Sequence, residues 1–143
     1  MPTDALMKAT NALHRTTLKL TGGKVGWKLR GMPVVQLTTT GRKSGVPRTV
    51  MLTSPLQEGR SVVVVASRGG DDVPPAWLLN IEADGRVQVS LGGRPAAPWT
   101  ARVATAEERA RMWPVVTREQ PHYGGYQEKT GREIPLVILE PVA

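Results

Sequence analysis

The chain has 143 residues, of which 40% are apolar, and it carries a formal net charge of +7 and no cysteine. This length predicts one domain with one core, and the apolar content excludes a disordered chain. The absence of cysteine excludes disulfides and thiolate metal sites, and His14 and His122 lie far apart, so we expect no bound metal. No run is apolar enough for a signal peptide or a membrane span, which favours a cytoplasmic protein.

The positive charge is concentrated in the first part of the chain. Residues 1–60 contain ten Lys or Arg and two acidic residues, whereas residues 61–143 contain nine basic and ten acidic residues. This asymmetry predicts an anionic partner, which could be a nucleic acid, an anionic membrane surface or a polyanionic small molecule. Aromatic residues make up only 4% of the chain, and no stacking platform or recognition motif is visible, so a nucleic acid is disfavoured.

An amphipathic helix is predicted from Thr3 to Leu20, inside an N-terminal segment that ends at Gly22. Apolar residues such as Leu6 and Leu13 form one stripe, and basic residues form another. Its basic face could contact a membrane or a cofactor tail, or it could simply be solvated.

Six strands and two further helices are predicted after this segment. The strands span residues 34–39, 49–53, 61–66, 86–91, 99–103 and 134–140, and residues 121–130 are expected to be irregular. Pro74-Pro75 begins one helix, and the capping box Thr105–Glu108 begins another that runs to about Glu119. Short connections favour a mostly antiparallel six-stranded sheet that curls into a barrel, in a single α+β domain over residues 1–143.

A glycine-rich basic loop follows the first predicted strand. Gly41 and Gly45 bracket Arg42, Lys43 and Ser44, and Pro47-Arg48 completes the loop. Glycines let the backbone approach a ligand closely, and the cations and hydroxyls suit a phosphate group. The alternative is a solvated basic hairpin, which the spacing alone does not exclude.

Two further segments could join this loop around an anion. These are Ser67–Gly70, after a buried strand, and the helix N-terminus at Pro74–Trp77. Trp77 could form an apolar wall or pack in the core, and Asn80 could bind the ligand or cap the chain. No nucleophile constellation, NTPase phosphate loop or Rossmann fingerprint is present, so an enzyme using this site would need a cofactor.

Several segments in order resemble the deazaflavin-dependent nitroreductase family. They are Pro33–Arg48, Val64–Gly70, Pro75–Asn80 and Ala104–Arg109. Within that family the chain is most similar to actinobacterial F420-dependent reductases that act on unsaturated lactones and coumarins. The resemblance implies a split β-barrel like that of flavin reductases and an enzyme that transfers hydride from reduced coenzyme F420 to a small electrophilic acceptor. This coenzyme has an apolar deazaflavin ring, a phosphodiester and a glutamate tail, so it is a polyanion.

The resemblance also implies roles for individual residues. Residues assigned to the phosphate and tail are Thr40, Arg42, Lys43, Ser44 and Arg48, and those assigned to the ring or phosphate region are Ala66, Ser67, Arg68 and Gly69. Pro75, Ala76, Trp77 and Asn80 would hold the ring and ribityl chain. Arg68 replaces an expected lysine, which keeps the charge and changes the donor geometry. Ser67, Tyr123 and Tyr126 are the candidate catalytic donors to the acceptor.

The acceptor pocket is assigned to Thr53 and Gln120. Both stand where nitroimidazole-activating members of the family have tyrosine, so a wider, more polar mouth is predicted. It should favour unsaturated lactones over bicyclic nitroimidazoles. The alternatives are a non-catalytic F420 carrier and a quinone reductase held at the membrane by its N-terminal helix, and a homodimer also remains open.

Overall fold

The computed structural model describes residues 28–29 and 31–142, so the helix predicted over residues 3–20 lies outside the described residues. In chain order the elements are β1 (Lys28–Leu29), β2 (Met32–Thr40), β3 (Pro47–Thr53), β4 (Leu56–Glu58), β5 (Ser61–Val65), the 3-10 turn η1 (Arg68–Gly70), α2 (Ala76–Ala83), β6 (Arg86–Leu91), β7 (Ala97–Val103), α3 (Ala106–Glu119), α4 (His122–Glu128) and β8 (Leu136–Pro141). Within these described elements, no helix has the length and apolar character needed to cross a bilayer.

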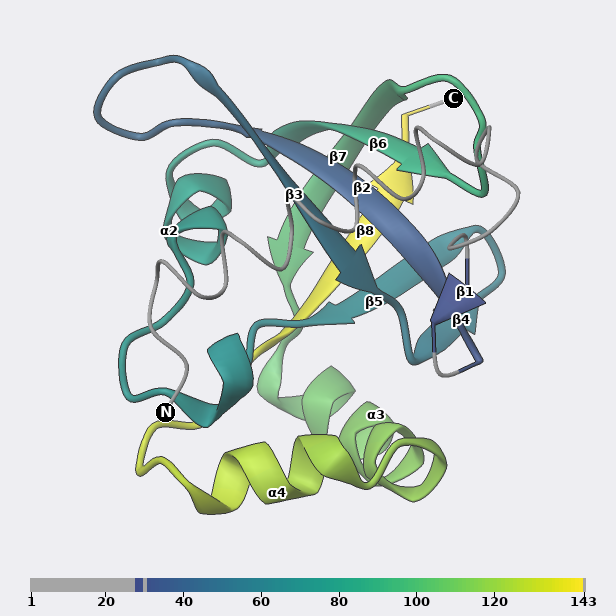
Figure 1. The fold of residues 1–143 in the computed structure, drawn as a ribbon, viewed down its shortest axis with the longest axis vertical. Helices are drawn as coiled ribbons and strands as arrows, with labels where there is room; N and C mark the ends of the chain where they lie inside the picture. The colour runs from purple at the N-terminus through teal and green to yellow at the C-terminus, as the bar shows by residue number, and fades with distance from the viewer. Residues whose placement is uncertain (1–27, 30, 143) are drawn as a thin grey trace.

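The strands form one curled antiparallel sheet (Figure 1). Its order is β1-β2-β6-β7-β8-β5-β4, and β3 pairs with β2 as an additional strand. Every pairing is antiparallel, as the short connections predicted. Among the described strands β3 and β4 each have one paired neighbour, so the sheet curls without closing between them. The predicted split-barrel fold is therefore confirmed, but the described sheet has eight strands instead of six.

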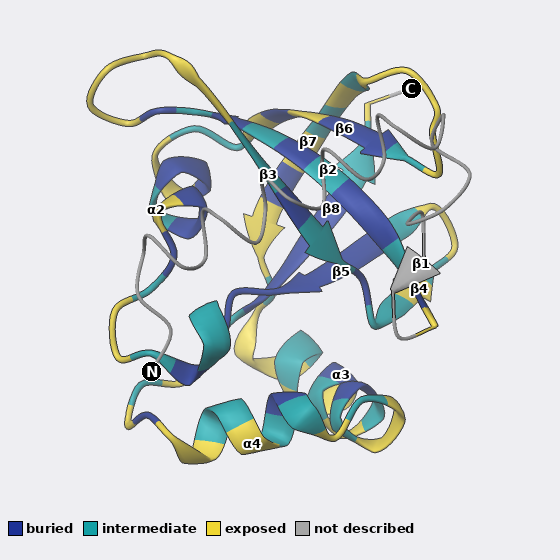
Figure 2. Cartoon of the chain, in the orientation of Figure 1, coloured by how far each residue is buried: buried dark blue, intermediate teal, exposed yellow. Residues whose placement is uncertain are grey.

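The core has two layers, one on each face of β5 and β8. Val62 and Val64 face a cluster that contains Trp77 of α2, whereas Val63 and Val65 face a cluster that contains Met112 of α3. A strand buried on both faces needs a continuous apolar run, and residues 62–65 are four consecutive valines. Figure 2 shows the resulting buried centre, with α2 beside one face of the sheet and α3 and α4 beneath the other.

One helix, α4, and two short strands, β1 and β4, differ from the sequence-based prediction. Residues 121–130 were expected to be irregular, but α4 occupies His122–Glu128 although it contains Gly124 and Gly125. Tyr123 buries its ring in the cluster around Met112, and this packing outweighs the low helix propensity of the two glycines. The prediction also missed β4, which is only three residues long.

The predicted capping box at the start of α3 is confirmed. The Thr105 hydroxyl accepts a hydrogen bond from the Glu108 amide at 3.1 Å, and the Glu108 carboxylate accepts one from the Thr105 amide at 2.9 Å. The same carboxylate accepts two bonds from the Arg102 guanidinium, at 2.7 and 3.0 Å. These contacts fix the start of α3 against β7.

Glu108 should therefore make the stability of the protein depend on pH in the acid range. The hydrogen bond from Arg102, followed by the bond from the Thr105 amide, lowers the pKa of Glu108 from 4.5 to about 2. A lowered folded-state pKa means that the carboxylate stabilises the fold fully above about pH 4.5 and loses this contribution as the pH falls toward 2. We expect Glu108→Gln to lower the urea midpoint clearly at pH 7 and much less at pH 3.

The matched control is Glu107→Gln in the same first turn of α3. Glu107 is exposed and takes no part in the capping box. A Glu108→Gln effect of equal size at pH 7 and pH 3, or one no larger than that of Glu107→Gln, would show that these bonds do not stabilise the helix.

Candidate functional site

The loop between β2 and β3 is a tight turn that depends on glycine. The Gly41 amide donates to the Val46 carbonyl at 2.9 Å, and the Gly45 amide donates to the Gly41 carbonyl at 2.8 Å. A Cβ atom on Gly41 would lie 2.8 Å from Ser44 Oγ and 3.0 Å from the Val46 oxygen, so a side chain does not fit there. Gly45 has a φ of 72°, which other residues rarely adopt. The glycines therefore set the shape of the basic loop.

Asn80 of α2 ties this loop to the body of the protein. Its Oδ1 accepts hydrogen bonds from the Arg42 amide at 3.1 Å and from Arg42 Nη1 at 3.2 Å. Its Nδ2 donates to Thr39 Oγ1 at 3.1 Å, and the Asn80 side chain is buried. A buried amide with three such contacts fixes both the loop and the direction of the Arg42 side chain. The sequence left open whether Asn80 binds a ligand or the chain; its side chain bonds the chain here, and the residue also lines the pocket beside the loop.

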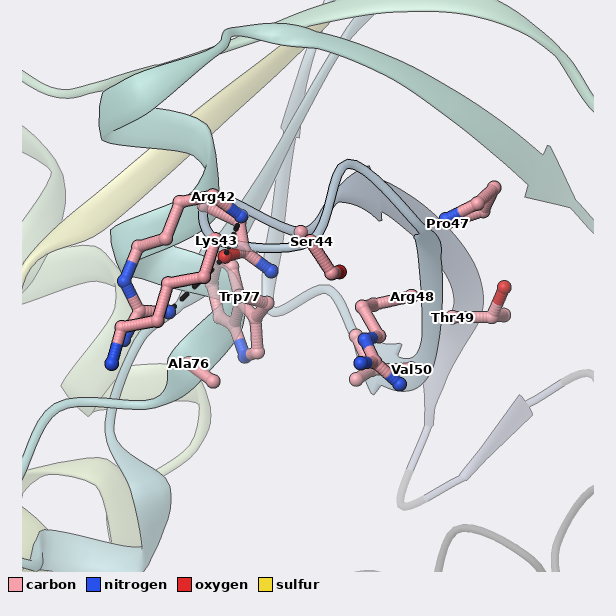
Figure 3. Close-up of a pocket in the computed structure, with 11 residues that line it drawn as sticks. Arg42, Lys43, Ser44, Pro47, Arg48, Thr49, Val50, Ala76 and Trp77 are labelled. Carbon is pink, nitrogen blue, oxygen red and sulfur yellow. Dashed lines mark hydrogen bonds between the residues drawn. The ribbon is translucent and has the colours of Figure 1, made fainter.

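The loop and the first turns of α2 enclose a pocket of about 580 Å³ (Figure 3). Its lining residues are Gly41, Arg42, Lys43, Ser44, Pro47, Arg48, Thr49, Val50, Ala76, Trp77 and Asn80. Three of them are basic, and among the described lining residues none is acidic. The Trp77 ring supplies an aromatic wall between the cations, and the positive end of α2 lies at the same place. The pocket therefore suits an anion attached to an apolar ring.

The segment after β5, which the sequence predicted to join this pocket, does not contribute to its lining. Ala66 is fully buried in the same cluster as Trp77, and Ser67 is 8% exposed. Arg68 pairs with Asp71 at 3.0 Å and has a φ of 46°. Pro75 is buried and is the N-cap of α2, so this segment leads directly into the pocket helix.

Thr40 is the one proposed phosphate-loop residue that faces elsewhere. It lines a second pocket of about 440 Å³, together with Thr38, Gln88 and Trp99 of the neighbouring strands. Side chains alternate between the two faces of a strand, so Thr40 lies on the opposite face from Thr39, which bonds Asn80. Thr49 and Val50 line the first pocket instead, and nothing in their strand-like sequence distinguished them.

The proposed acceptor residues lie together at the far end of β3. Thr53 Oγ1 and Tyr123 Oη are 3.3 Å apart, and the Tyr126 ring meets the Tyr123 ring edge-on with centroids 6.0 Å apart. The Gln120 carbonyl accepts from the Tyr123 amide at 3.2 Å. Thr53 is six residues from Pro47, which in a strand corresponds to about 20 Å. One strand thus links the basic pocket to a cluster of hydroxyls.

His122 is a member of this cluster that the sequence reasoning did not assign. Its ring centroid lies 4.1 Å from that of Tyr123 and 5.4 Å from that of Tyr126. Its place next to a predicted tyrosine was the only available signal, because the surrounding residues were expected to be irregular.

Comparisons with known proteins identify relatives across nearly the whole chain. A family model described as F420H(2)-dependent quinone reductase matches residues 11–141. An F420H(2)-dependent quinone reductase of Mycobacterium tuberculosis strain H37Rv is 34% identical over 130 residues, which cover 89% of this chain and 87% of that protein.

Solved structures agree with the sequence comparisons. A structure of an F420-H2 dependent reductase (FDR-A) matches with a TM-score of 0.66 and 41% identity over 76% of this chain and 94% of that chain. A structure described as a domain-swapped dimer matches with a TM-score of 0.68 and 36% identity over 92% of this chain and 99% of that chain. A pyridoxamine 5′-phosphate oxidase-like protein of Listeria innocua, at 13% identity and a TM-score of 0.51 over 92% of this chain and 94% of that chain, shares the fold.

Proposed function

Because this chain belongs to the F420H(2)-dependent quinone reductase family, we propose that its basic pocket binds reduced coenzyme F420 and that a conjugated carbonyl compound is reduced at the Thr53–Tyr123 end of β3. That the chain is an F420H2-dependent reductase follows from the family and from the solved F420-H2 dependent reductase. The position of the coenzyme and the identity of the acceptor are our proposal. The observation that carries it is the pocket with three cations and an aromatic wall.

The residues around the pocket fit the chemistry of the coenzyme. Arg42, Lys43 and Arg48 can bind a phosphodiester and the carboxylates of a glutamate tail, and Trp77 can contact an apolar ring. The Asn80 bond directs the Arg42 guanidinium before any ligand arrives, which lowers the entropy cost of binding. None of the described lining residues is acidic, so none would repel the polyanion.

In the proposed mechanism the protein orients the coenzyme and acceptor, excludes water and stabilises the negative charge that develops on the acceptor. Reduced F420 supplies a hydride from its deazaflavin ring when it is bound. The basic loop would hold the phosphodiester and tail, Trp77 would contact the ribityl end of the ring, and the ring would extend along β3 toward Tyr123, where the surrounding side chains would keep water from the acceptor. Ser67, with Tyr123 or Tyr126, would donate a hydrogen bond to the acceptor oxygen as negative charge develops there.

The acceptor class is proposed from the hydroxyls at the end of β3. The relative in Mycobacterium tuberculosis is described as a quinone reductase, and quinones and α,β-unsaturated lactones share a carbonyl conjugated to a carbon–carbon double bond. Thr53 and Gln120 stand where nitroimidazole-activating members of the family have tyrosine. The acceptor pocket at this end of β3 is therefore more polar and lacks two aromatic rings. A fused acceptor such as a coumarin could fill the space with its own rings. We therefore propose unsaturated lactones and quinones as acceptors, ahead of bicyclic nitroimidazoles.

A panel of acceptors at matched concentration tests this proposal. Oxidation of reduced F420 should be measurable with a quinone and an unsaturated lactone, and weak with a bicyclic nitroimidazole. The double variant Thr53→Tyr, Gln120→Tyr should gain nitroimidazole activity. Efficient nitroimidazole reduction by the wild type without any lactone activity would contradict the acceptor assignment. Tight binding without turnover of any acceptor would favour the carrier alternative.

A further inference from the structure

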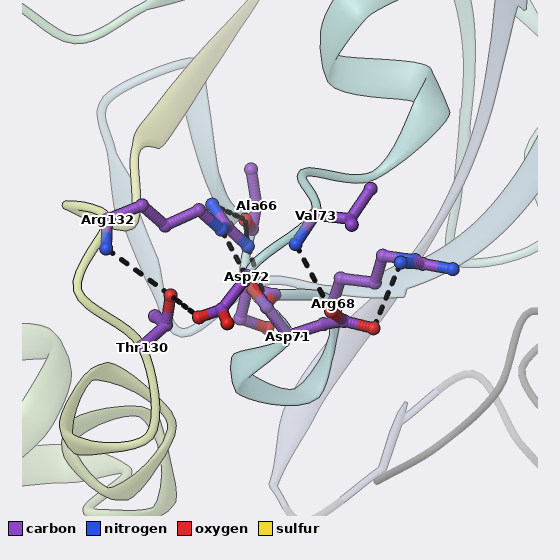
Figure 4. A network of polar contacts seen from close by, with 8 residues as sticks. Ala66, Arg68, Asp71, Asp72, Val73, Thr130 and Arg132 are labelled. Atoms are coloured by element: carbon purple, nitrogen blue, oxygen red, sulfur yellow. Dashed lines mark hydrogen bonds and ion pairs between the residues drawn. The ribbon is translucent and has the colours of Figure 1, made fainter.

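Arg132 lies in the loop between α4 and β8, and its side chain reaches the segment after β5 (Figure 4). Nε donates to the Asp71 carbonyl at 2.9 Å, and Nη2 donates to the Ser67 carbonyl at 2.9 Å. Nη1 and Nη2 also lie 3.3 and 3.2 Å from the Ala66 carbonyl. One planar guanidinium therefore binds three backbone carbonyls of the turn formed by residues 66–71. Only arginine has enough donors in a fixed fork to do this.

The turn that Arg132 holds has an unusual backbone. Arg68, Gly69 and Gly70 have φ values of 46°, 65° and 85° in succession. A Cβ on Gly70 would lie 2.7 Å from the Tyr126 carbonyl oxygen, so α4 packs directly against the backbone there. Glycine adopts such φ values readily, but for Arg68 the left-handed conformation is costly unless the surrounding structure fixes it, and Arg132 supplies several of the bonds that do so.

A second contact holds the same turn from the same side. Thr130, two residues before Arg132, donates its hydroxyl to Asp72 Oδ1 at 2.6 Å and accepts from the Arg132 amide at 3.3 Å. The α4–β8 loop therefore makes hydrogen bonds to the turn at four residues, namely Ala66, Ser67, Asp71 and Asp72. Because α4 carries Tyr123 and Tyr126, these hydrogen bonds also fix the turn relative to the proposed acceptor residues.

The direction of the carbonyls determines where the amides lie. In a trans peptide the C=O and the following N–H point in opposite directions. Because the Ala66 and Ser67 carbonyls point at Arg132, the amides of Ser67 and Arg68 are directed away from it. Two adjacent amides directed away from Arg132 form a fixed set of dipoles of the kind that stabilises negative charge.

We propose that Arg132 is a positioning residue for hydride transfer, acting through the backbone of residues 66–71 and not by contact with coenzyme or acceptor. This inference depends on the proposed function of the chain. Burial lowers the pKa of Arg132, and the nearby Asp71 and Asp72 oppose this effect, yet a guanidinium remains charged at neutral pH. A lysine in its place would lose the planar fork and would hold its charge less well in the same surroundings.

The test compares Arg132→Lys with Arg109→Lys. Arg109 of α3 holds the other side of the same region, donating to the Ile134 carbonyl of the α4–β8 loop at 2.9 Å and to Gln127 Oε1 of α4 at 3.2 Å, and none of these contacts reaches the turn. We expect Arg132→Lys to reduce the rate of hydride transfer about 100-fold, as a misplacement near 1 Å can do. Affinity for oxidised F420 should fall less than tenfold. Arg109→Lys should leave both within about twofold of the wild type.

Hydrogen exchange of the protein without coenzyme supplies a readout independent of activity. Arg132→Lys should speed exchange of the amides of Gly70 and Asp71, which donate to the Ser67 and Arg68 carbonyls inside the turn. Thr130→Val, which preserves side-chain shape and removes the bond to Asp72, should have a smaller effect in the same direction. If Arg132→Lys does not fold, Thr130→Val alone must still show faster exchange and slower hydride transfer.

The outcomes separate this inference from the proposed function. If the wild type binds no F420, the proposed function fails. A second outcome is that the wild type binds and turns over F420 while Arg132→Lys and Arg109→Lys have the same hydride-transfer rate and the same amide exchange. In that case Arg132 stabilises the fold but does not position the site. Equal losses of rate in both variants, with equal losses of melting temperature, would also overturn the positioning role.

Discussion

Replacing Arg42 and Lys43 together with Ala should weaken binding of oxidised F420 about 30-fold without unfolding the protein. A hydrogen bond to a charged group contributes roughly 1.5–3 kcal/mol when it is shielded from water. Both side chains are exposed, so solvent reduces each contribution to about 1 kcal/mol, which is roughly a factor of five per residue. The Arg42 amide still bonds Asn80 in this variant, so the loop should keep its shape. A titration of each purified variant with the coenzyme measures the change.

The matched control is Arg94→Ala, Arg118→Ala, which removes the same net charge from exposed positions outside the pocket. It separates local contacts from the general attraction of a basic protein for a polyanion. We expect the control to bind within about threefold of the wild type at 0.15 M salt. Equal affinity for the Arg42, Lys43 variant and its control would mean that the loop is a solvated turn.

Replacing Ser67 with Ala should reduce the hydride-transfer rate constant about 100-fold while F420 affinity changes less than about twofold. Removal of one hydrogen-bond donor that stabilises developing negative charge typically costs about 10²–10³ in kcat. The Ser67 contact with Arg132 uses the backbone carbonyl, so the turn keeps that support in the variant. Single-turnover oxidation of reduced F420 with a saturating quinone gives the rate constant.

Ser90→Ala is the control for this change. Ser90 has the same 8% exposure as Ser67, but its hydroxyl donates to the Arg94 carbonyl at 2.6 Å in the β6–β7 turn. A loss of rate in Ser90→Ala as large as that in Ser67→Ala would point to a general loss of stability. An unchanged rate in Ser67→Ala would remove Ser67 from the proposed mechanism and leave Tyr123 and Tyr126 as the candidate donors.

Elements encoded by local patterns could be predicted from the sequence. The four consecutive valines of β5 indicate a strand buried on both faces, and the Thr105–Glu108 capping box marks the start of α3. Alternation along β6 predicts its exposed Gln88 between the buried Val87 and Val89. In each case the signal lies within a few residues, so no knowledge of the tertiary structure is needed.

Elements that depend on distant contacts could not be predicted in this way. The α4 helix contains two glycines and depends on burial of Tyr123 against α3 and the sheet. The bond from Arg42 to Asn80 spans 38 positions, and the bonds from Arg132 to Ala66 span 66. Neither residue type has a local pattern that identifies its partner. The two contacts that position the site are thus properties of the fold rather than of any motif.

The site itself was predictable to the extent that it is built from contiguous loops. The sequence predicted that the basic loop and the N-terminus of the helix that begins after Pro75 could meet around an anion. Residues of both segments line the pocket. Which individual side chains face the pocket depends on strand alternation and register. This is why Arg48 and Val50, which pair with Thr39 and Leu37, line the pocket while Thr40 faces the other side of the sheet.

A fluorescence titration with oxidised F420 and, in parallel, flavin mononucleotide tests the central assignment most directly. The wild type and the Arg42→Ala, Lys43→Ala variant should be compared at low and at physiological salt. We expect the wild type to prefer F420 with a long glutamate tail, with a preference that shrinks as salt screens the exposed cations over about 8–10 Å. The variant should lose most of this preference. Equal affinity of the wild type for tailed and tailless coenzyme at low salt, unaffected by loss of Arg42 and Lys43, would contradict the assignment of the basic pocket to F420.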